Sequence, residues 1–336
     1  MGIIAFMEAD YAQASQLHLR ALKIARKFGV MSLPANATMQ LALIEHRRGD
    51  YDQALKLYSE SLRVFRGLGD WEGTAGVLKN MGDIKLRQGN HTEAAQLFSQ
   101  ALETFRKAGN IGGGCAALHS LAVIEQDRGN YDKALKLCNR CLIAALKLGD
   151  QMGVTKALQT MGDIEAMKEN IERASQLYRQ ALEIEQRIGD RLGFAWTLMQ
   201  LGRIELRRGS CEPAEKLVNQ SLDIQRRLGD QLGVAEGLFI LGRIEQAKGN
   251  SAQAHELYDQ SLGISRKLGD QSRIARTVLI QGQIAEEQGD LKLAEERYRQ
   301  AIDIYEKVGA ESYLRNARED LERVRKLKQK QKPERS

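Results

Sequence analysis

The sequence predicts an all-α solenoid built from antiparallel helix pairs. The 336-residue sequence aligns with itself at an offset of 40 residues, and no insertion breaks this register between residues 1 and 310. A fixed period of this length is typical of stacked supersecondary units. The low content of aromatic residues (5%) and the presence of only 3 prolines favour helices over a β-sandwich.

Three sets of residues recur every 40 positions and define the repeat. One is an isoleucine set that runs from Ile4 to Ile284, and another is an alanine set that runs from Ala14 to Ala294. The glycine set consists of Gly29, Gly69, Gly109, Gly149, Gly189, Gly229, Gly269 and Gly309. Because the register is continuous, the array leaves no room for a second domain inside it.

Each unit consists of two predicted helices, as residues 191–230 illustrate. Leu198, Leu201 and Ile204 form one apolar stripe along the first helix. Gly209 ends that helix, since glycine adopts the left-handed conformation that closes a helix. An Asp, Asn or Ser follows this glycine position in every unit and is expected to cap the second helix. These residues are Asp10, Asp50, Asn90, Asn130, Asn170, Ser210, Asn250 and Asp290.

The pattern resembles the tetratricopeptide repeat over residues 1–310. In one unit the matching residues are Leu201, Gly202, Gly209, Ala214 and Ser221. The period is 40 rather than the usual length of about 34, and Gly-Asp replaces the proline that often closes a unit. The chain is therefore similar to the long-repeat subgroup of Pins-type scaffolds and bacterial signalling arrays. This resemblance implies a right-handed superhelical solenoid.

The array is expected to have an incomplete start and a capped end. The predicted layout is a half repeat at 1–30, then seven 40-residue units starting at 31, 71, 111, 151, 191, 231 and 271, a capping helix at 311–329 and a basic tail at 330–336. Met1 falls at the position of Leu41, in the middle of a first helix. We therefore expect either a longer protein of which this is the C-terminal part, or a misplaced start.

The charge and the termini exclude several classes of protein. Residues 325–336 carry a net charge of +5 out of the total of +6, so no basic face for specific nucleic-acid binding is expected. No apolar run approaches the ~18 residues of a membrane span, and no signal peptide is recognisable. The chain is expected to be cytoplasmic, with its four cysteines reduced. The sequence does not indicate an oligomeric state.

Glu245 directly follows Ile244, an apolar residue of the predicted helix. Burial beside an apolar face raises the pKa of a carboxylate, as a general acid requires. However, a glutamate recurs here in five units, each time with Arg or Lys three residues later, as expected for a surface pair on a helix. These glutamates are Glu45, Glu125, Glu165, Glu205 and Glu245. The pattern predicts a structural role for Glu245.

The remaining candidates for chemistry are also interpreted as structural. Cys138 and Cys141 form a lone CxxC at positions that other units fill with packing residues. No P-loop, dinucleotide fingerprint, nucleophile elbow or histidine ligand spacing occurs. We expect no enzyme activity, no metal and no cofactor.

The resemblance places partner binding on the face of each first helix that is opposite its core. In the fifth and sixth units this face carries two arginines, Arg203 and Arg243, flanked by Trp196 and Phe239. Arginine holds carboxylates and aromatic residues serve as anchors, so the expected partner is an acidic, partly apolar protein segment. The predicted contact residues are Trp196, Met199, Arg203, Arg207, Phe239, Arg243, Met39, Leu43, Lys79, His119 and Lys156.

A structural alternative exists for the same residues. Arg203 and Arg243 would then pair internally with Glu236 or Asp163, and the apolar residues would pack against neighbouring units. For the whole chain, the predicted function is that of a non-catalytic adaptor. The alternative is a regulatory or sensory module of a larger signalling protein, such as an ATPase, a cyclase or a transcription regulator.

Overall fold

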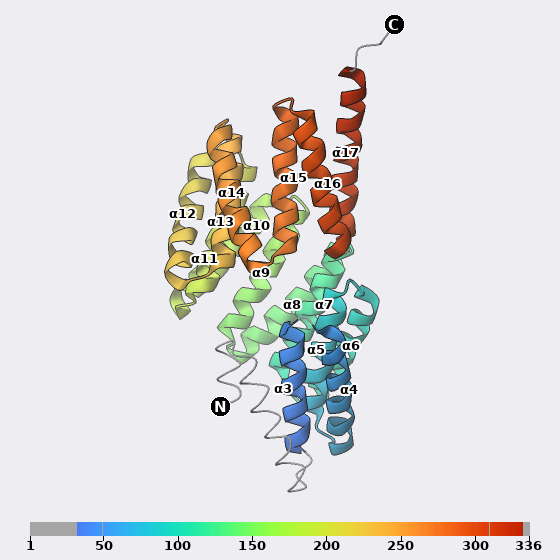
Figure 1. Cartoon of the computed structure of the whole chain (residues 1–336). Helices are drawn as coiled ribbons and strands as arrows, with labels where there is room; N and C mark the ends of the chain where they lie inside the picture. The colour runs from blue at the N-terminus through green and yellow to red at the C-terminus, as the bar shows by residue number, and fades with distance from the viewer. Residues whose placement is uncertain (1–31, 49, 309, 332–336) are drawn as a thin grey trace. The chain divides into compact units, whose positions relative to one another are not determined.

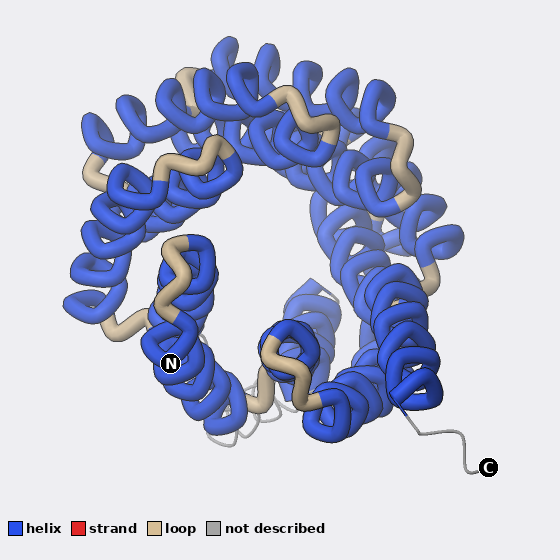
Figure 2. The backbone as a smooth tube through the Cα atoms, turned by 90° about the horizontal axis from the view of Figure 1, so that it is seen from above, coloured by secondary structure: helices blue, strands red, loops and turns tan. Residues whose placement is uncertain are grey.

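The computed structural model describes residues 32–48, 50–308 and 310–331. Within these ranges the chain forms 15 α-helices and no strand (Figures 1 and 2). The helices are α3 (Ser32–Arg48), α4 (Tyr51–Leu68), α5 (Trp71–Arg87), α6 (His91–Lys107), α7 (Ile111–Asp127), α8 (Tyr131–Leu148), α9 (Gln151–Met167), α10 (Ile171–Ile188), α11 (Arg191–Arg207), α12 (Cys211–Leu228), α13 (Gln231–Ala247), α14 (Ser251–Leu268), α15 (Gln271–Glu287), α16 (Leu291–Val308) and α17 (Glu311–Gln331).

The chain divides into two compact units, residues 1–164 and 165–336. The first unit contains α3 to α8 and most of α9, and the second contains α10 to α17. In each unit consecutive helices pack against one another, and two or three residues join them. The predicted all-α fold of paired helices is confirmed.

The turn between two repeats ends one helix and starts the next, as predicted. Gly69 follows α4 with a left-handed φ of 67°. The Asp70 side chain then accepts a hydrogen bond of 2.8 Å from the Gly73 backbone N–H, in the first turn of α5. Eleven described glycines have positive φ angles between 67° and 85°, all at the two turn positions of the repeat. Glycine is therefore favoured at these positions, because it adopts a positive φ without steric cost.

The predicted caps in the middle of each repeat are only partly correct. Asp50 and Asn90 accept hydrogen bonds from the first turns of α4 and α6. No such side-chain bond is made by Asn130, Asn170, Ser210 and Asn250. The Asn250 amide instead donates a 2.7 Å hydrogen bond to the Glu245 carboxylate. A carboxylate is a stronger acceptor than a neutral group, and it turns the amide away from the capping geometry.

Glu245 has the structural role that its repetition predicts. Lys248 donates to its carboxylate at 2.9 Å, and the side chain is almost fully buried. The hydrogen bond from Asn250 lowers the pKa of the Glu245 carboxyl, and so do the hydrogen bond and the positive charge of Lys248. Glu125 makes the same pair with Arg128 at 3.4 Å. A carboxyl held ionised in this way supports the helix turn and is unsuited to act as a general acid.

Small residues bring the two helices of a repeat into close contact. A Cβ atom added to Gly242 on α13 would lie 2.7 Å from the Tyr258 ring on α14. The equivalent atom on Gly202 would lie 2.6 Å from Val218. These distances are shorter than any normal carbon–carbon contact, so a larger residue would force the Tyr258 ring or the Val218 side chain to shift. The predicted close approach of the helices is confirmed.

Glu169 occupies a turn position where the other described units have glycine. Its φ is 62°, a conformation that costs a non-glycine residue about 1–2 kcal/mol. Glu169→Gly is therefore expected to raise the free energy of unfolding by about 1 kcal/mol, measured by urea titration. The reverse change at the equivalent position, Gly129→Glu, should lower stability by a similar amount. A destabilised Glu169→Gly protein would contradict this assignment of strain.

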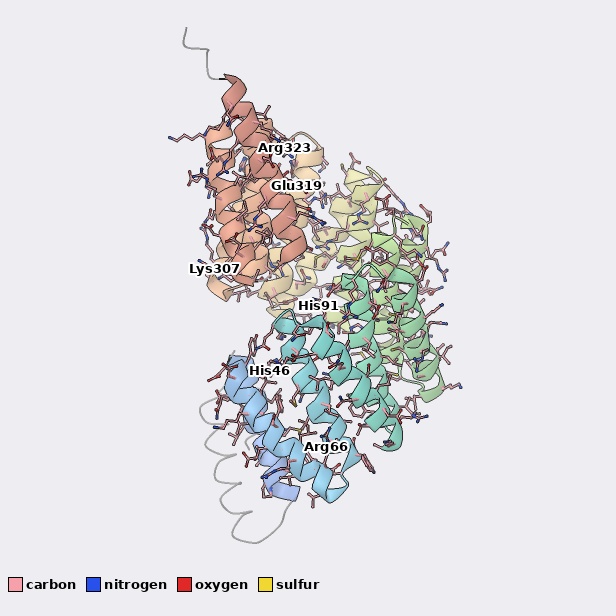
Figure 3. All side chains as sticks on the ribbon, turned by 90° about the vertical axis from the view of Figure 1, so that its right-hand side faces the viewer. His46, Arg66, His91, Lys307, Glu319 and Arg323 are labelled. Atoms are coloured by element: carbon pink, nitrogen blue, oxygen red, sulfur yellow. The ribbon has the colours of Figure 1, made fainter. Side chains whose placement is uncertain are left out.

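The last helix, α17, packs on α16 through Ala317, Leu321 and Val324. Arg323 on α17, labelled in Figure 3, donates a hydrogen bond of 2.7 Å from its Nε to the Glu286 carboxylate. The helix extends two residues beyond the expected 311–329. The predicted half repeat at 1–30, including Met1, and the end of the basic tail lie outside the described residues.

Candidate functional site

In the second unit, the first helices of three successive repeats bring charged side chains together. Arg203 on α11 pairs with Glu236 on α13. From α15, Arg273 and Arg276 donate to the same carboxylate. Arg273 also donates through its Nε to Asp270, at 3.1 Å. We call Arg203, Glu236, Arg273 and Arg276 the arginine cluster.

Positive charge exceeds negative charge in the arginine cluster. The Glu236 carboxylate, 15% exposed, contacts three guanidinium groups, and Asp270 adds a second carboxylate for Arg273. Burial lowers the pKa of both Arg273 and Arg276, because it disfavours the charged form of the guanidinium group. The Arg276 guanidinium lies 4.2 Å from the ring centroid of Phe239. The buried Nε of Arg276 has no hydrogen-bond partner among the described residues.

An open cavity of about 200 Å³ adjoins the arginine cluster. Two tyrosines on one side of it, Tyr305 and Tyr313, are stacked with ring centroids 5.6 Å apart. The cavity is lined by Glu236, Asp270, Ser272, Arg273, Arg276, Tyr305, Ala310 and Tyr313. Guanidinium groups next to an aromatic pair can hold a carboxylate that is attached to an apolar group.

Two of the predicted contact residues are not available at the surface. Met199 is 1% exposed and Phe239 is 4% exposed. Both belong to the hydrophobic core around α13, because the neighbouring repeat covers the face of the first helix that was predicted to be free. Trp196 is half-buried, and its ring packs edge-on against Tyr178 at 6.2 Å. The prediction of exposed anchors was therefore wrong for Met199 and Phe239.

The two arginines of the predicted pair have different surroundings. Arg203 joins Glu236, as the structural alternative has it, whereas Arg243 is exposed and forms no ion pair in the described part of the chain. Arg207 is exposed as well and donates a 2.7 Å hydrogen bond to the Ala166 carbonyl. Sequence reasoning missed Arg273, although it replaces a glycine found at the equivalent position of five preceding units.

In the first unit, the predicted residues Lys79, His119 and Lys156 line one cavity of about 300 Å³. Burial, followed by the charges of Lys156 and Lys79, lowers the pKa of His119. His119 is therefore neutral at pH 7, and its Nδ1 lies 3.3 Å from the Thr160 hydroxyl. The other predicted residues of this unit, Met39 and Leu43, are half-buried and do not line this cavity.

Cys115, Cys138 and Cys141 contribute to the same cavity, but their environment does not activate them. Burial raises the pKa of both Cys138 and Cys141 to about 12, so the thiolate form is scarce at neutral pH. No group of three or more His, Cys, Asp or Glu side chains among the described residues is arranged to hold a metal ion. The thiols pack within the core, as predicted for the CxxC pair.

None of the helices in the described ranges combines the length and apolar character that crossing a membrane requires. No match was found among curated proteins. Among solved structures, the chain is similar to the apo form of RapI, with a TM-score of 0.68 and 17% identity over 82% of this chain and 99% of that chain. It is also similar to the apo quorum sensor NprR from B. thuringiensis, with a TM-score of 0.71 and 16% identity over 90% and 85% of the two chains.

A third similar structure is the Rap conjugation gene regulator of plasmid pLS20 in complex with the Phr* peptide. Its TM-score is 0.65 and its identity 19%, over 83% of this chain and 76% of that chain. At such identities the likeness concerns the fold. Tetratricopeptide repeat models match residues 33–107, 115–187, 193–267 and 233–307, and a second model of the same repeat matches residues 79–145. The chain belongs to the tetratricopeptide repeat family.

Proposed function

We propose that the chain is a non-catalytic adaptor that binds an acidic, partly apolar segment of a partner protein. Two proteins of similar fold are known in complexes, the Rap conjugation gene regulator of plasmid pLS20 with the Phr* peptide and a Rap protein with Competence and Sporulation Factor. Identity to them is low, so the argument for this chain depends on its own residues. A cytoplasmic location agrees with its four free thiols.

The arginine cluster is the observation that carries this proposal. Three guanidinium groups contact the Glu236 carboxylate, and two of them, those of Arg273 and Arg276, line the adjoining cavity, so a carboxylate supplied by a ligand would meet guanidinium donors there. Arginine binds a carboxylate through two parallel N–H donors, which fixes the orientation of the ligand. Stacked Tyr305 and Tyr313 supply the apolar contact in the adjoining cavity.

Each unit has further cations outside the arginine cluster. Arg207 and Arg243 are exposed on α11 and α13. In the first unit, the exposed Lys156 and the half-buried Lys79 flank a second cavity, where a partner could make a separate contact. In the second unit we place the acidic residues of the partner on Arg207 and Arg243 and its apolar residues beside Trp196 and the two tyrosines.

The test begins with a peptide selected from a random display library on the immobilised chain. Affinity is then measured by fluorescence anisotropy of the labelled peptide. We expect selected peptides to be enriched in Asp or Glu next to an apolar residue. Arg203→Ala/Arg243→Ala should raise the Kd at least about tenfold, since charge-assisted hydrogen bonds are lost.

Arg226→Ala/Arg227→Ala is the matched control, because both arginines are exposed at the end of α12, outside the arginine cluster and its cavity. It should leave the Kd nearly unchanged and have the same thermal stability as the wild type. An affinity that is equal in the wild type, Arg203→Ala/Arg243→Ala and Arg273→Ala would place peptide binding elsewhere and contradict the proposal.

A further inference from the structure

A separate cavity of about 450 Å³ lies between α6, α7 and α8 in the first unit. This volume is within the range of about 300–1,000 Å³ that is typical of small-molecule sites. Only Cys115 also lines the neighbouring cavity of Lys79, His119 and Lys156. None of the residues that carry the proposed peptide site in the second unit takes part in it.

The cavity lies where two repeat positions have lost side-chain volume. Gly114 occupies a position that six other units fill with Pro34, Thr74, Val154, Phe194, Val234 and Ile274. Ala144 occupies a position that other units fill with Val64, Thr104, Ile184, Ile224, Ile264 and Ile304. Both Gly114 and Ala144 line the cavity. The space is therefore specific to this helix pair and is not a general property of the repeat.

The interior of the cavity is apolar. Leu102, Phe105 and Leu118 line it, and the last two are each 6% exposed over the whole molecule. Ile111 also lines it and is 48% exposed, as expected of a residue at the mouth. A Cβ atom added to Gly114 would lie 3.7 Å from Leu102 Cδ1, which is an ordinary contact distance. An alkyl chain inside would thus be surrounded by hydrocarbon.

Cations lie at the edge of this apolar interior. Arg106 and Arg140 both belong to the lining. Arg106 is paired with Glu103 at 3.0 Å, whereas Arg140 is exposed and forms no ion pair within the described ranges. Five other units have glutamine at the position of Arg140, namely Gln100, Gln180, Gln220, Gln260 and Gln300. Arg140 thus places a positive charge beside the cavity at a position where most units have a neutral amide.

We propose that this cavity binds a small amphipathic carboxylic acid. The alkyl body lies between Leu102, Phe105 and Leu118, and the carboxylate contacts the Arg140 guanidinium. Burial of each methylene group favours binding, and the guanidinium orients the acid with its charged end toward solvent. The combination of a mostly apolar lining and one unpaired cation at its edge favours a ligand with one charged end.

Dodecanoate, below its micelle concentration, is the probe, and isothermal titration calorimetry is the measurement. The wild type should bind it saturably, with one molecule per chain. Gly114→Val/Ala144→Ile restores residues of the kind that other units hold, and it should weaken binding at least about tenfold. Gly76→Val on α5 is the matched control, because no atom lies within 4 Å of its added Cβ. It should bind as the wild type does.

The role of Arg140 has its own comparison. Arg140→Gln should weaken dodecanoate binding about tenfold and leave dodecanol binding unchanged. Thermal melts followed by circular dichroism check that each variant is folded.

Absence of saturable binding to the wild type would overturn the proposal, and so would undiminished binding to Gly114→Val/Ala144→Ile. An equal loss of dodecanol binding in Arg140→Gln would overturn the assignment of the carboxylate. Loss of peptide affinity upon filling the cavity would identify the occupant as a partner side chain instead.

Discussion

Ile164→Ala is expected to lower the free energy of unfolding by about 2–5 kcal/mol. Ile164 is fully buried and packs against Ala122, Ala134 and Cys138 in the core of the first unit. Removal of its side chain leaves a cavity that the surrounding helices can only partly close, because each helix is held by both of its neighbours. Urea titration followed by far-UV circular dichroism measures the loss.

Met167→Ala is the control for this substitution, since Met167 lies on the same helix and is 51% exposed. It should change stability by only a few tenths of a kcal/mol, as is usual for surface substitutions. An Ile164→Ala protein as stable as the wild type would show that the isoleucine set does not form the core, and would contradict the 40-residue register.

Glu185→Gln is expected to stabilise the protein increasingly as the pH rises. Glu185 is fully buried on α10, at a position where other units have Phe65, Phe105 or Tyr305. Burial raises the pKa of its carboxyl from 4.5 to about 7, even though the Thr197 hydroxyl donates a 3.1 Å hydrogen bond to it. The folded protein thus favours the neutral acid.

A folded pKa above the unfolded one means that the neutral acid contributes full stability below about pH 4.5. This contribution is lost as the pH rises toward 7, and it is absent at higher pH. The stability advantage of Glu185→Gln over the wild type should therefore grow by about 2–3 kcal/mol between pH 5 and pH 8. Parallel urea titrations at the two pH values measure it.

The exposed Glu183 on the same helix supplies the control variant, Glu183→Gln. Its stability difference from the wild type should be small at both pH values, because an exposed carboxylate is already solvated. A stability advantage of Glu185→Gln that is the same at pH 5 and pH 8 would contradict the assignment of a neutral buried acid.

The repeat register predicts the fold to a large extent because each recurring residue has a local physical role. Gly69 ends a helix, Asp70 starts the next, and Gly242 admits the ring of Tyr258. These roles need only the residue and its immediate neighbours. The caps at Asn130 and Asn250 were mispredicted because a carboxylate one turn earlier on the preceding helix competes for the amide.

The candidate site was predicted less completely. A helical wheel shows which residues face away from the core of their own repeat, but it does not show how much of that face the next repeat covers. Met199 and Phe239 are buried for this reason. The arginine cluster joins residues of three repeats, and Tyr313 comes from α17, outside the repeat pattern altogether. Among these residues, only Arg273 is conspicuous in the sequence, because five preceding units have glycine at the equivalent position.

The most direct measurement of peptide binding by the arginine cluster is hydrogen exchange, read by mass spectrometry, with and without the selected acidic peptide. We expect the peptide to slow exchange in segments of α11, α13 and α15 and at the start of α17, where the cluster and the two tyrosines lie. The outer helices α12 and α14 should exchange unchanged. Protection confined to α12 and α14, or to the first unit, would contradict the assignment of the arginine cluster as the peptide site.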